Sequence, residues 1–317
     1  MDRRQFVLSS TAALAAGQLS SRLASSASDD LSPVGVQLFS LPKLLERDFR
    51  QGIAILAGMG FKEVEFYGPF DFSAPEAIAG WKAITPQLGF SGSGFFGHSA
   101  QQVRAILDEH RMTAPSVHTD WATLQTGMSR LAEAARTVGY TYVGLPSIPD
   151  ALRRTLDDYK RMADNFNKVG DDAKKNGLKF AYHNHGYGLV PMEGTVPLQL
   201  LLERTDPNLV FFEMDIYWTV AGGANPIELL RAHPNRYHLM HVKDMKEVRR
   251  FRGDGGDPGQ WIELFPFMTT AGDGVMDLRG IVTAARAAGV KHFFVEQDMV
   301  ANPDVALKRS FDFVSKL

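Results

Sequence analysis

The stretch RRTLDDYKRMADNFNKVGDDAKKNGLKFAYHNH, residues 153–185, decides the fold. It contains one apolar stripe at helical spacing, made of Leu156, Tyr159, Met162, Ala163, Phe166, Val169 and Ala173. This stripe predicts a helix over Arg153–Asn176. Asn176-Gly177 is a typical helix stop, and the apolar run Lys179–His183 that follows it predicts a buried strand. A helix that leads directly into a buried strand is the unit of a parallel sheet.

The same alternation continues through the rest of the chain. Seven further β-branched or aromatic runs predict strands at Val34–Phe39, Glu63–Tyr67, Ala114–His118, Thr141–Leu145, Leu209–Met214, Tyr237–Val242 and His292–Glu296. Eight strand–helix repeats fit closure into a barrel better than an open, doubly wound sheet, which is the alternative. We therefore expect one α/β domain over residues 31–317, a TIM (β/α)8 barrel. Long connections follow Tyr67 and Met245, and loops of such length on a barrel tend to be functional.

Composition excludes several classes of protein. The chain has 317 residues, with Lys+Arg 34 against Asp+Glu 36 and a net charge of -2. It therefore has no basic field for binding nucleic acid or an anionic membrane. There is no cysteine in the sequence, which excludes disulfides, a thiolate nucleophile and Cys-ligated metals. Any metal must be bound by His, Asp or Glu.

The first thirty residues have the features of an export signal rather than of a folded domain. Asp2-Arg3-Arg4 opens a short apolar stretch that runs through Leu19, and small residues then offer a cleavage site after Ala27. The arginine pair resembles a twin-arginine signal, which exports folded proteins, so we expect a periplasmic protein. The apolar stretch is too short and too interrupted to form a stable membrane anchor. The alternative for residues 1–30 is a disordered amphipathic tail.

Polar residues gather where the last four predicted strands end. In a barrel enzyme the chemistry lies at the carboxyl ends of the strands. Because strand residues alternate between two faces, groups two residues apart share a face. The pairs at this spacing are His183 and His185, Glu213 and Asp215, His241 and Lys243, and Glu296 and Asp298. These strands are neighbours in a barrel, so their imidazoles and carboxylates should converge on one divalent metal ion such as Mn²⁺, Zn²⁺, Fe²⁺ or Co²⁺.

Four ordered motifs resemble the sugar phosphate isomerase/epimerase family of xylose isomerase-like barrels. They are Phe180–Gly186, Glu213–Trp218, His241–Asp244 and Phe294–Asp298. The resemblance implies a TIM barrel with one divalent metal, Mn, Zn, Co, Fe or Mg, acting on a keto sugar. In the epimerases of this family, strands five to eight supply Glu, Asp, His and Glu ligands. Asp215, His241 and Glu296 match the last three of these, whereas His183 occupies the first position, so the family's pair of opposed glutamates is missing.

The chemistry expected from these groups is enolisation. A divalent ion that chelates a ketone and its neighbouring hydroxyl acidifies the intervening C–H and stabilises an enediolate. Glu296, His185 or Lys243 could act as the base that removes this proton. Reprotonation gives an isomerase or epimerase, whereas loss of a β-oxygen group gives a lyase or hydratase. Because His183 replaces one of the two opposed glutamates, we slightly favour elimination or hydration on a 3-keto sugar or glycoside.

Four further residues are predicted substrate contacts, each with a structural alternative. Glu65 could instead form a salt bridge in the barrel, and His118 could simply satisfy hydrogen bonds. Glu213 could bond a ligand histidine from below, and Trp218 could pack in the core rather than stack on a sugar. We expect a small keto sugar or glycoside as partner and no nucleic acid, with a homo-oligomer allowed. The alternatives from other classes are a non-catalytic periplasmic sugar-binding barrel and a DNA-repair endonuclease of the same fold, which needs a basic groove.

Overall fold

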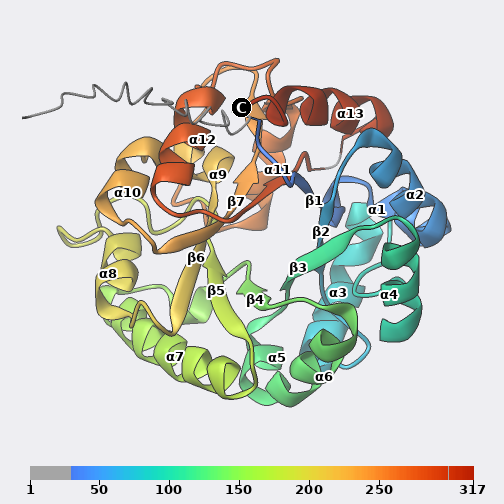
Figure 1. The fold of residues 1–317 in the computed structure, drawn as a ribbon. Helices are drawn as coiled ribbons and strands as arrows, with labels where there is room; N and C mark the ends of the chain where they lie inside the picture. Colours follow the sequence, from blue (N-terminus) through green and yellow to red (C-terminus); the bar gives the residue numbers. More distant parts are fainter. Residues whose placement is uncertain (1–29, 299) are drawn as a thin grey trace, which may run out of the picture.

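The computed structural model describes residues 30–298 and 300–317, so the predicted leader lies outside the described residues except for its last position. Eight parallel strands close into a barrel in the order β1-β2-β3-β4-β5-β6-β7-β10 and back to β1 (Figure 1). The strands are β1 (Gly35–Gln37), β2 (Glu63–Tyr67), β3 (Thr113–His118), β4 (Tyr142–Leu145), β5 (Lys179–His183), β6 (Val210–Asp215), β7 (Tyr237–Val242) and β10 (His292–Val295). The expected single-domain TIM barrel is confirmed.

Most of the helices surround the barrel on its outside (Figure 1). They are α1 (Pro42–Arg47), α2 (Phe49–Met59), α3 (Pro75–Leu88), α4 (Ala100–Glu109), α5 (Trp121–Thr126), α6 (Met128–Val138), α7 (Leu156–Lys175), α8 (Pro197–Arg204), α9 (Ile216–Ala221), α10 (Pro226–Ala232), α11 (Pro258–Leu264), α12 (Leu278–Ala287) and α13 (Pro303–Val314). Their apolar faces and the outward side chains of the strands form one continuous core. Among the described residues, no helix has the length and apolar character needed to cross a membrane.

Element ends differ from the sequence predictions by a few residues, for local reasons. The first strand stops at Gln37, whose side chain accepts a hydrogen bond from Phe39 N and turns the chain into a 3₁₀ helix over Leu38–Ser40. Helix α7 begins at Leu156 because Thr155 and Asp158 form a reciprocal capping box. The stripe that predicted this helix is buried as expected.

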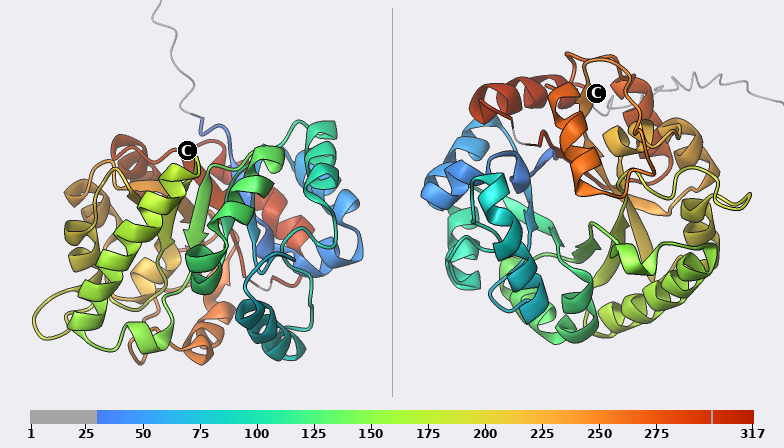
Figure 2. Two further views of the ribbon diagram at one scale, coloured as in Figure 1. Left: turned by 90° about the horizontal axis from the view of Figure 1, so that it is seen from below. Right: turned by 180° about the vertical axis from the view of Figure 1, so that it is seen from behind.

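Both long connections contain structure of their own. The β2–β3 connection contains α3 and α4, and the β7–β10 connection contains α11, α12 and a small two-stranded antiparallel sheet. This small sheet pairs β8 (Asp244–Met245) with β9 (Met268–Thr269). Figure 2 shows α3 and α11 over the same end of the barrel, the one at which the parallel strands finish. These connections therefore build the rim around the strand ends.

Candidate metal centre

The candidate site lies at the carboxyl ends of the barrel strands. The parallel register sets His183 beside Glu213 and Asp215 beside His241, so the groups meet across β5, β6 and β7. On the far side of the barrel, β2 contributes Glu65. His118 of β3 fits because β4 has a glycine beside it: a Cβ on Gly144 would lie 2.8 Å from His118 Cδ2. The strands thus bring all these groups into one buried space.

Deep in this space lies an inner cluster, which we define as Glu65, His118 and Glu213. Glu213 Oε2 lies 2.6 Å from His118 Nε2 and 3.1 Å from His183 Nδ1. Glu65 Oε2 lies 2.6 Å from His241 Nε2. Burial alone would raise the pKa of the Glu213 carboxyl. The neighbouring imidazoles of His241, His118 and His183 outweigh this effect and hold the pKa well below its usual range. The inner cluster therefore orients both His183 and His241.

Nearer the barrel mouth lies an outer cluster, which we define as Asp215, Lys243, Glu296 and Asp298. The ammonium of Lys243 is 2.9 Å from Asp215 Oδ2, 2.7 Å from Glu296 Oε2 and 2.6 Å from Asp298 Oδ2. Burial works against the charged form, but these three carboxylates outweigh it and raise the pKa of Lys243 well above its ordinary value. Lys243 is therefore held as an ammonium ion.

His183 and His241 connect the two clusters. Each turns one ring nitrogen to the inner cluster, as described above, and the other nitrogen to Asp215. The distances from Asp215 Oδ2 are 3.9 Å to His183 Nε2 and 3.9 Å to His241 Nδ1. His241 Nδ1 is also 2.7 Å from Glu296 Oε2. Metal–ligand bonds to N and O are about 2.0–2.2 Å, so two ligands of one ion can be up to about 4.2 Å apart.

Two sets of side chains could bind a cation. The ligand atoms of His118, His183, Glu213 and His241 lie within 4.8 Å of one another, and so do those of Asp215, His241 and Glu296. Three of the four predicted ligands, Asp215, His241 and Glu296, therefore form one of these sets. The fourth, His183, belongs to the other set, together with His118 and Glu213 of the inner cluster. The assignment of these four residues as the ligands stays a prediction.

The donor chemistry fits a divalent ion. Among the described residues, Glu65 Oε1 and Glu213 Oε1 are buried oxygens without a hydrogen-bond partner, whereas Asp215 Oδ2 has the ammonium of Lys243 at 2.9 Å. Leaving buried carboxylate oxygens without donors is costly, and a cation would satisfy them. The orientation of Asp215 is fixed because its Oδ1 accepts a hydrogen bond from Trp218 N at the start of α9. Its Oδ2 faces the two histidines and Lys243.

An aromatic group lies beside the outer cluster. The ring of His185 stacks on Trp261 of α11 at 4.2 Å and lies 5.8 Å from the ring of Trp218. Lys243 Nζ lies over the same Trp218 ring at 5.3 Å. His185 Nδ1 is 2.7 Å from the carbonyl oxygen of Pro146, which can only accept, so Nδ1 carries the hydrogen and Nε2 keeps its lone pair. Burial lowers the pKa of His185 well below its usual value, as do His183 and Lys243.

The predicted substrate contacts fall in two places. Glu65, His118 and Glu213 are buried in the inner cluster, bonded to imidazoles, whereas Trp218 is buried against His185 and Phe251. Sequence reasoning missed Trp261 and gave no role to Asp298. An aromatic residue in the long connection after β7 was the one signal for Trp261, and the two-residue step from Glu296 was the signal for Asp298.

Comparison with known proteins places the chain in a family. Residues 53–317 match the xylose isomerase-like TIM barrel family. The chain belongs to this family. Inosose dehydratase of Geobacillus thermodenitrificans is 31% identical over 165 residues, which cover 51% of this chain and 53% of that protein. Inosose dehydratase of Clostridium tetani is 34% identical over 130 residues, covering 40% and 42%. The chain thus matches about half the length of these curated relatives.

Solved structures share the fold of this family member. A sugar phosphate isomerase/epimerase from Parabacteroides distasonis superposes with a TM-score of 0.67 at 22% identity, covering 90% of this chain and 98% of that one. The IolI protein, crystallised with a zinc atom, superposes with a TM-score of 0.64 at 15% identity over the same shares, 90% and 98%. At these identities the likeness concerns the fold.

Proposed function

We propose that this protein is a divalent-metal-dependent lyase that removes water from an unphosphorylated keto sugar or keto polyol. The observation that carries the proposal is the outer cluster, where a candidate cation site, a buried ammonium ion and a neutral imidazole lie side by side. His183, Asp215, His241 and Glu296 would bind the ion. When bound, the ion would polarise the substrate carbonyl and acidify the neighbouring C–H.

His185 is the best placed base of the three predicted. It is neutral, its Nδ1–H is fixed by Pro146, and its Nε2 lone pair is free to take a proton. Glu296 is a weaker base: although burial opposes it, Lys243 and His241 hold the pKa of Glu296 well below its usual range. Lys243 is already protonated and cannot accept a proton.

Lys243 is suited to act as the acid that donates a proton. As an ammonium ion it can donate a proton to the departing hydroxyl, which leaves as water. Asp298 lies in neither of the two cation-binding sets of described residues, so it can keep its 2.6 Å contact with Lys243 while Asp215 and Glu296 serve an ion. His185 and Lys243 both contact the Trp218 ring, so a base and an acid are held against one surface.

Charge argues against a phosphorylated substrate. Five carboxylates surround the site, those of Glu65, Glu213, Asp215, Glu296 and Asp298. They outnumber the groups that favour a positive charge, which are Lys243 and the imidazoles of His118 and His241, whose pKa values these carboxylates raise against the effect of burial. A phosphate group brought into this excess of carboxylates would be repelled. The names of the curated relatives, inosose dehydratases, support removal of water from a keto polyol.

Isomerisation or epimerisation is the second candidate. The same enolised intermediate can be reprotonated by Lys243 instead of losing water, and the fold neighbour named a sugar phosphate isomerase/epimerase favours this outcome. A non-catalytic sugar-binding barrel gains no support from these named enzymes.

The deciding experiment is NMR in D₂O with metal-loaded protein, inososes, 3-keto-glycosides and common ketoses. Loss of water or of an aglycone would support the lyase, whereas deuterium exchange with a changed configuration would establish an isomerase. The Asp215→Asn and His185→Gln variants should lose the reaction, the first together with its metal and the second with its metal retained. No exchange and no product across the panel, with metal bound, would count against any enolising enzyme.

A further inference from the structure

A second cavity lies on the rim of the barrel, away from the metal centre. It has a volume of about 650 Å³, which is within the range of small-molecule sites. The loop after β2, the start of α3 and the junction of α5 and α6 enclose it. Its walls are joined by a hydrogen bond from Ala74 N to the buried Thr123 Oγ1, 2.9 Å long.

One side of the cavity is apolar and well supported. Phe72, Pro75, Ile78 and Ala79 line it. Phe72 is fixed by stacking on Phe70, with ring centroids 5.1 Å apart and an interplanar angle of 6°. Helix α3 buries none of its residues fully, so this apolar surface stays open to a ligand.

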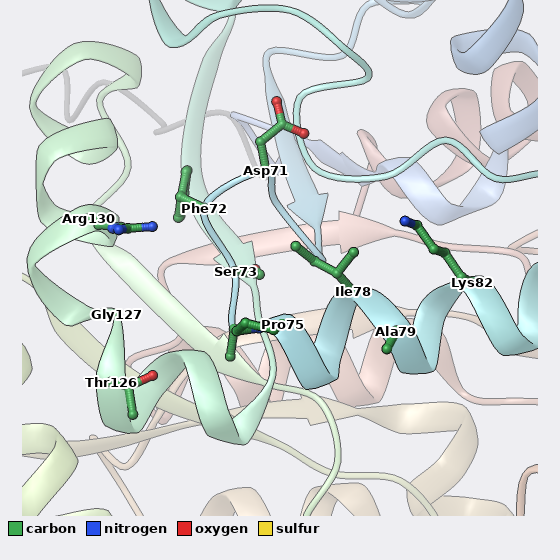
Figure 3. Close-up of a pocket in the computed structure, with 11 residues that line it drawn as sticks. Asp71, Phe72, Ser73, Pro75, Ile78, Ala79, Lys82, Thr126, Gly127 and Arg130 are labelled. Carbon is green, nitrogen blue, oxygen red and sulfur yellow. The ribbon is translucent and has the colours of Figure 1, made fainter.

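Two cations face each other across this surface. Figure 3 shows the side chains of Lys82 and Arg130 extending from opposite sides toward the space above Phe72 and Ile78. Within residues 30–298 and 300–317, neither forms an ion pair. Asp71 also lines the cavity: in Figure 3 its side chain lies between those of Arg130 and Lys82, with the carboxylate turned away from Phe72 and Ile78. The start of α6 at Gly127 adds the positive end of a helix that has neither a side-chain cap nor an acidic residue in its first turn.

We propose that this cavity binds a small organic anion, with an aromatic or aliphatic body on Phe72 and Ile78 and a carboxylate or phosphate group between Lys82 and Arg130. Arginine and lysine recognise both head groups through charge-assisted hydrogen bonds. The apolar wall adds affinity that a free inorganic ion cannot gain. The site is separate from the metal centre, so the proposal does not depend on the proposed function.

Calorimetric titration of the metal-loaded protein tests the proposal. The probes are benzoate and phenyl phosphate, with inorganic phosphate as the head group alone and benzyl alcohol as the body alone. We expect both organic anions to bind more tightly than either partial probe. The Lys82→Gln/Arg130→Gln variant should weaken their binding about tenfold or more. The Asp71→Asn variant should tighten it about two- to fivefold, because a competing charge is removed.

A matched control removes the same charge from the opposite rim. Lys62 and Arg111 are exposed and precede β2 and β3, so Lys62→Gln/Arg111→Gln should leave binding of the organic anions unchanged. The Lys82/Arg130 variant should also keep its metal content and its activity on keto sugars. Equal binding by this variant and by the native protein, or binding of benzyl alcohol as tight as that of benzoate, would overturn the proposal.

Discussion

At the scale of single residues, His183 and His241 are central to the candidate metal centre because each has two different neighbours. One nitrogen of each ring faces a carboxylate of the inner cluster and the other faces Asp215. A carboxylate behind a histidine fixes the tautomer and the orientation of the ring and makes the distal nitrogen a better ligand. Glu213 and Glu65 therefore hold the two imidazole rings in the orientation that binding of a cation would need.

This arrangement predicts a loss of metal affinity when Glu213 is changed to Gln. The amide preserves the shape but removes the charge that orients His183, so the affinity should fall about 10- to 100-fold, measured by competition with a chelator. The control is Glu63→Gln, since Glu63 also contacts a histidine, His292, at 2.9 Å, but at the other end of the barrel. A loss far beyond hundredfold would mark Glu213 as a direct ligand, and unchanged affinity would contradict its orienting role.

The sequence predicted most of the residues that lie at the site, but not which of their side chains contact one another. Strand alternation was enough to bring Asp215, His241 and Glu296 to one end, because the carboxyl ends of parallel strands meet there. It could not show that His183 would share Glu213 with His118, since that contact depends on the direction of side chains across a closed barrel and on the space left by Gly144. The contact of His118 with Glu213 joins residues 95 positions apart in the sequence and needs the closed barrel as well as this local fit.

At the scale of elements, α11 adds to the site a residue that no strand supplies. Trp261 lies against the face of His185 at 4.2 Å, and its Nε1 donates to the carbonyl oxygen of Gly255, 2.7 Å away. Changing Trp261 to Ala should free the His185 ring to rotate and lower kcat at least tenfold while metal affinity stays unchanged. Ile262→Ala is the control, because Ile262 is on the same helix and 52% exposed. An unchanged kcat in the Trp261 variant would show that α11 does not position the base.

A second polar group, which includes His238, lies at the amino ends of the strands and affects the stability of the fold. His238 Nδ1 of β7 is hydrogen-bonded to the hydroxyl group of Tyr142 of β4, with an O···N distance of 3.0 Å. Burial lowers the pKa of His238 to about 4, with help from Lys291, Lys179 and His292. The neutral ring is thus the one that fits the fold.

This depressed pKa predicts a loss of stability in mild acid. In the unfolded chain His238 gains its proton near pH 6.5, whereas in the folded chain it does so only near pH 4, so the unfolded state binds more protons between these values. The free energy of unfolding should therefore fall as the pH drops from 6.5 to 4, by about 1–2 kcal/mol from this residue, since solvent near the barrel end screens part of the effect. Urea unfolding at pH 7 and pH 5 should show a smaller difference for His238→Gln than for the native protein.

At the scale of the whole molecule, the barrel was predictable because its signal is repeated. Each strand is a short apolar run next to an amphipathic helix, and an error in one repeat leaves the other seven in place. The small β8–β9 sheet was missed because each strand has two residues, too few for any periodicity. The end of β1 was overestimated because Leu38 and Phe39 are as apolar as strand residues, although Gln37 turns the backbone there.

The amino-terminal segment of the chain predicts export to the periplasm. Arg3 and Arg4 resemble a twin-arginine signal, which carries folded proteins. Folding first would let the ligands of the barrel acquire their metal in the cytoplasm, before competing ions are met outside. We expect Arg3→Lys/Arg4→Lys to retain the protein in the cytoplasm with its metal bound, and the native chain to reach the periplasm cleaved after Ala27.

Cell fractionation and mass spectrometry of the amino terminus would measure both outcomes. The matched control is Arg22→Lys, since Arg22 lies in the same leader but outside the arginine pair. Asp215→Asn adds a sharper test: a folded barrel with little metal should still be exported, because the signal depends on folding rather than on the metal. Periplasmic accumulation of the Arg3/Arg4 variant at the native level would show that the arginine pair does not direct export.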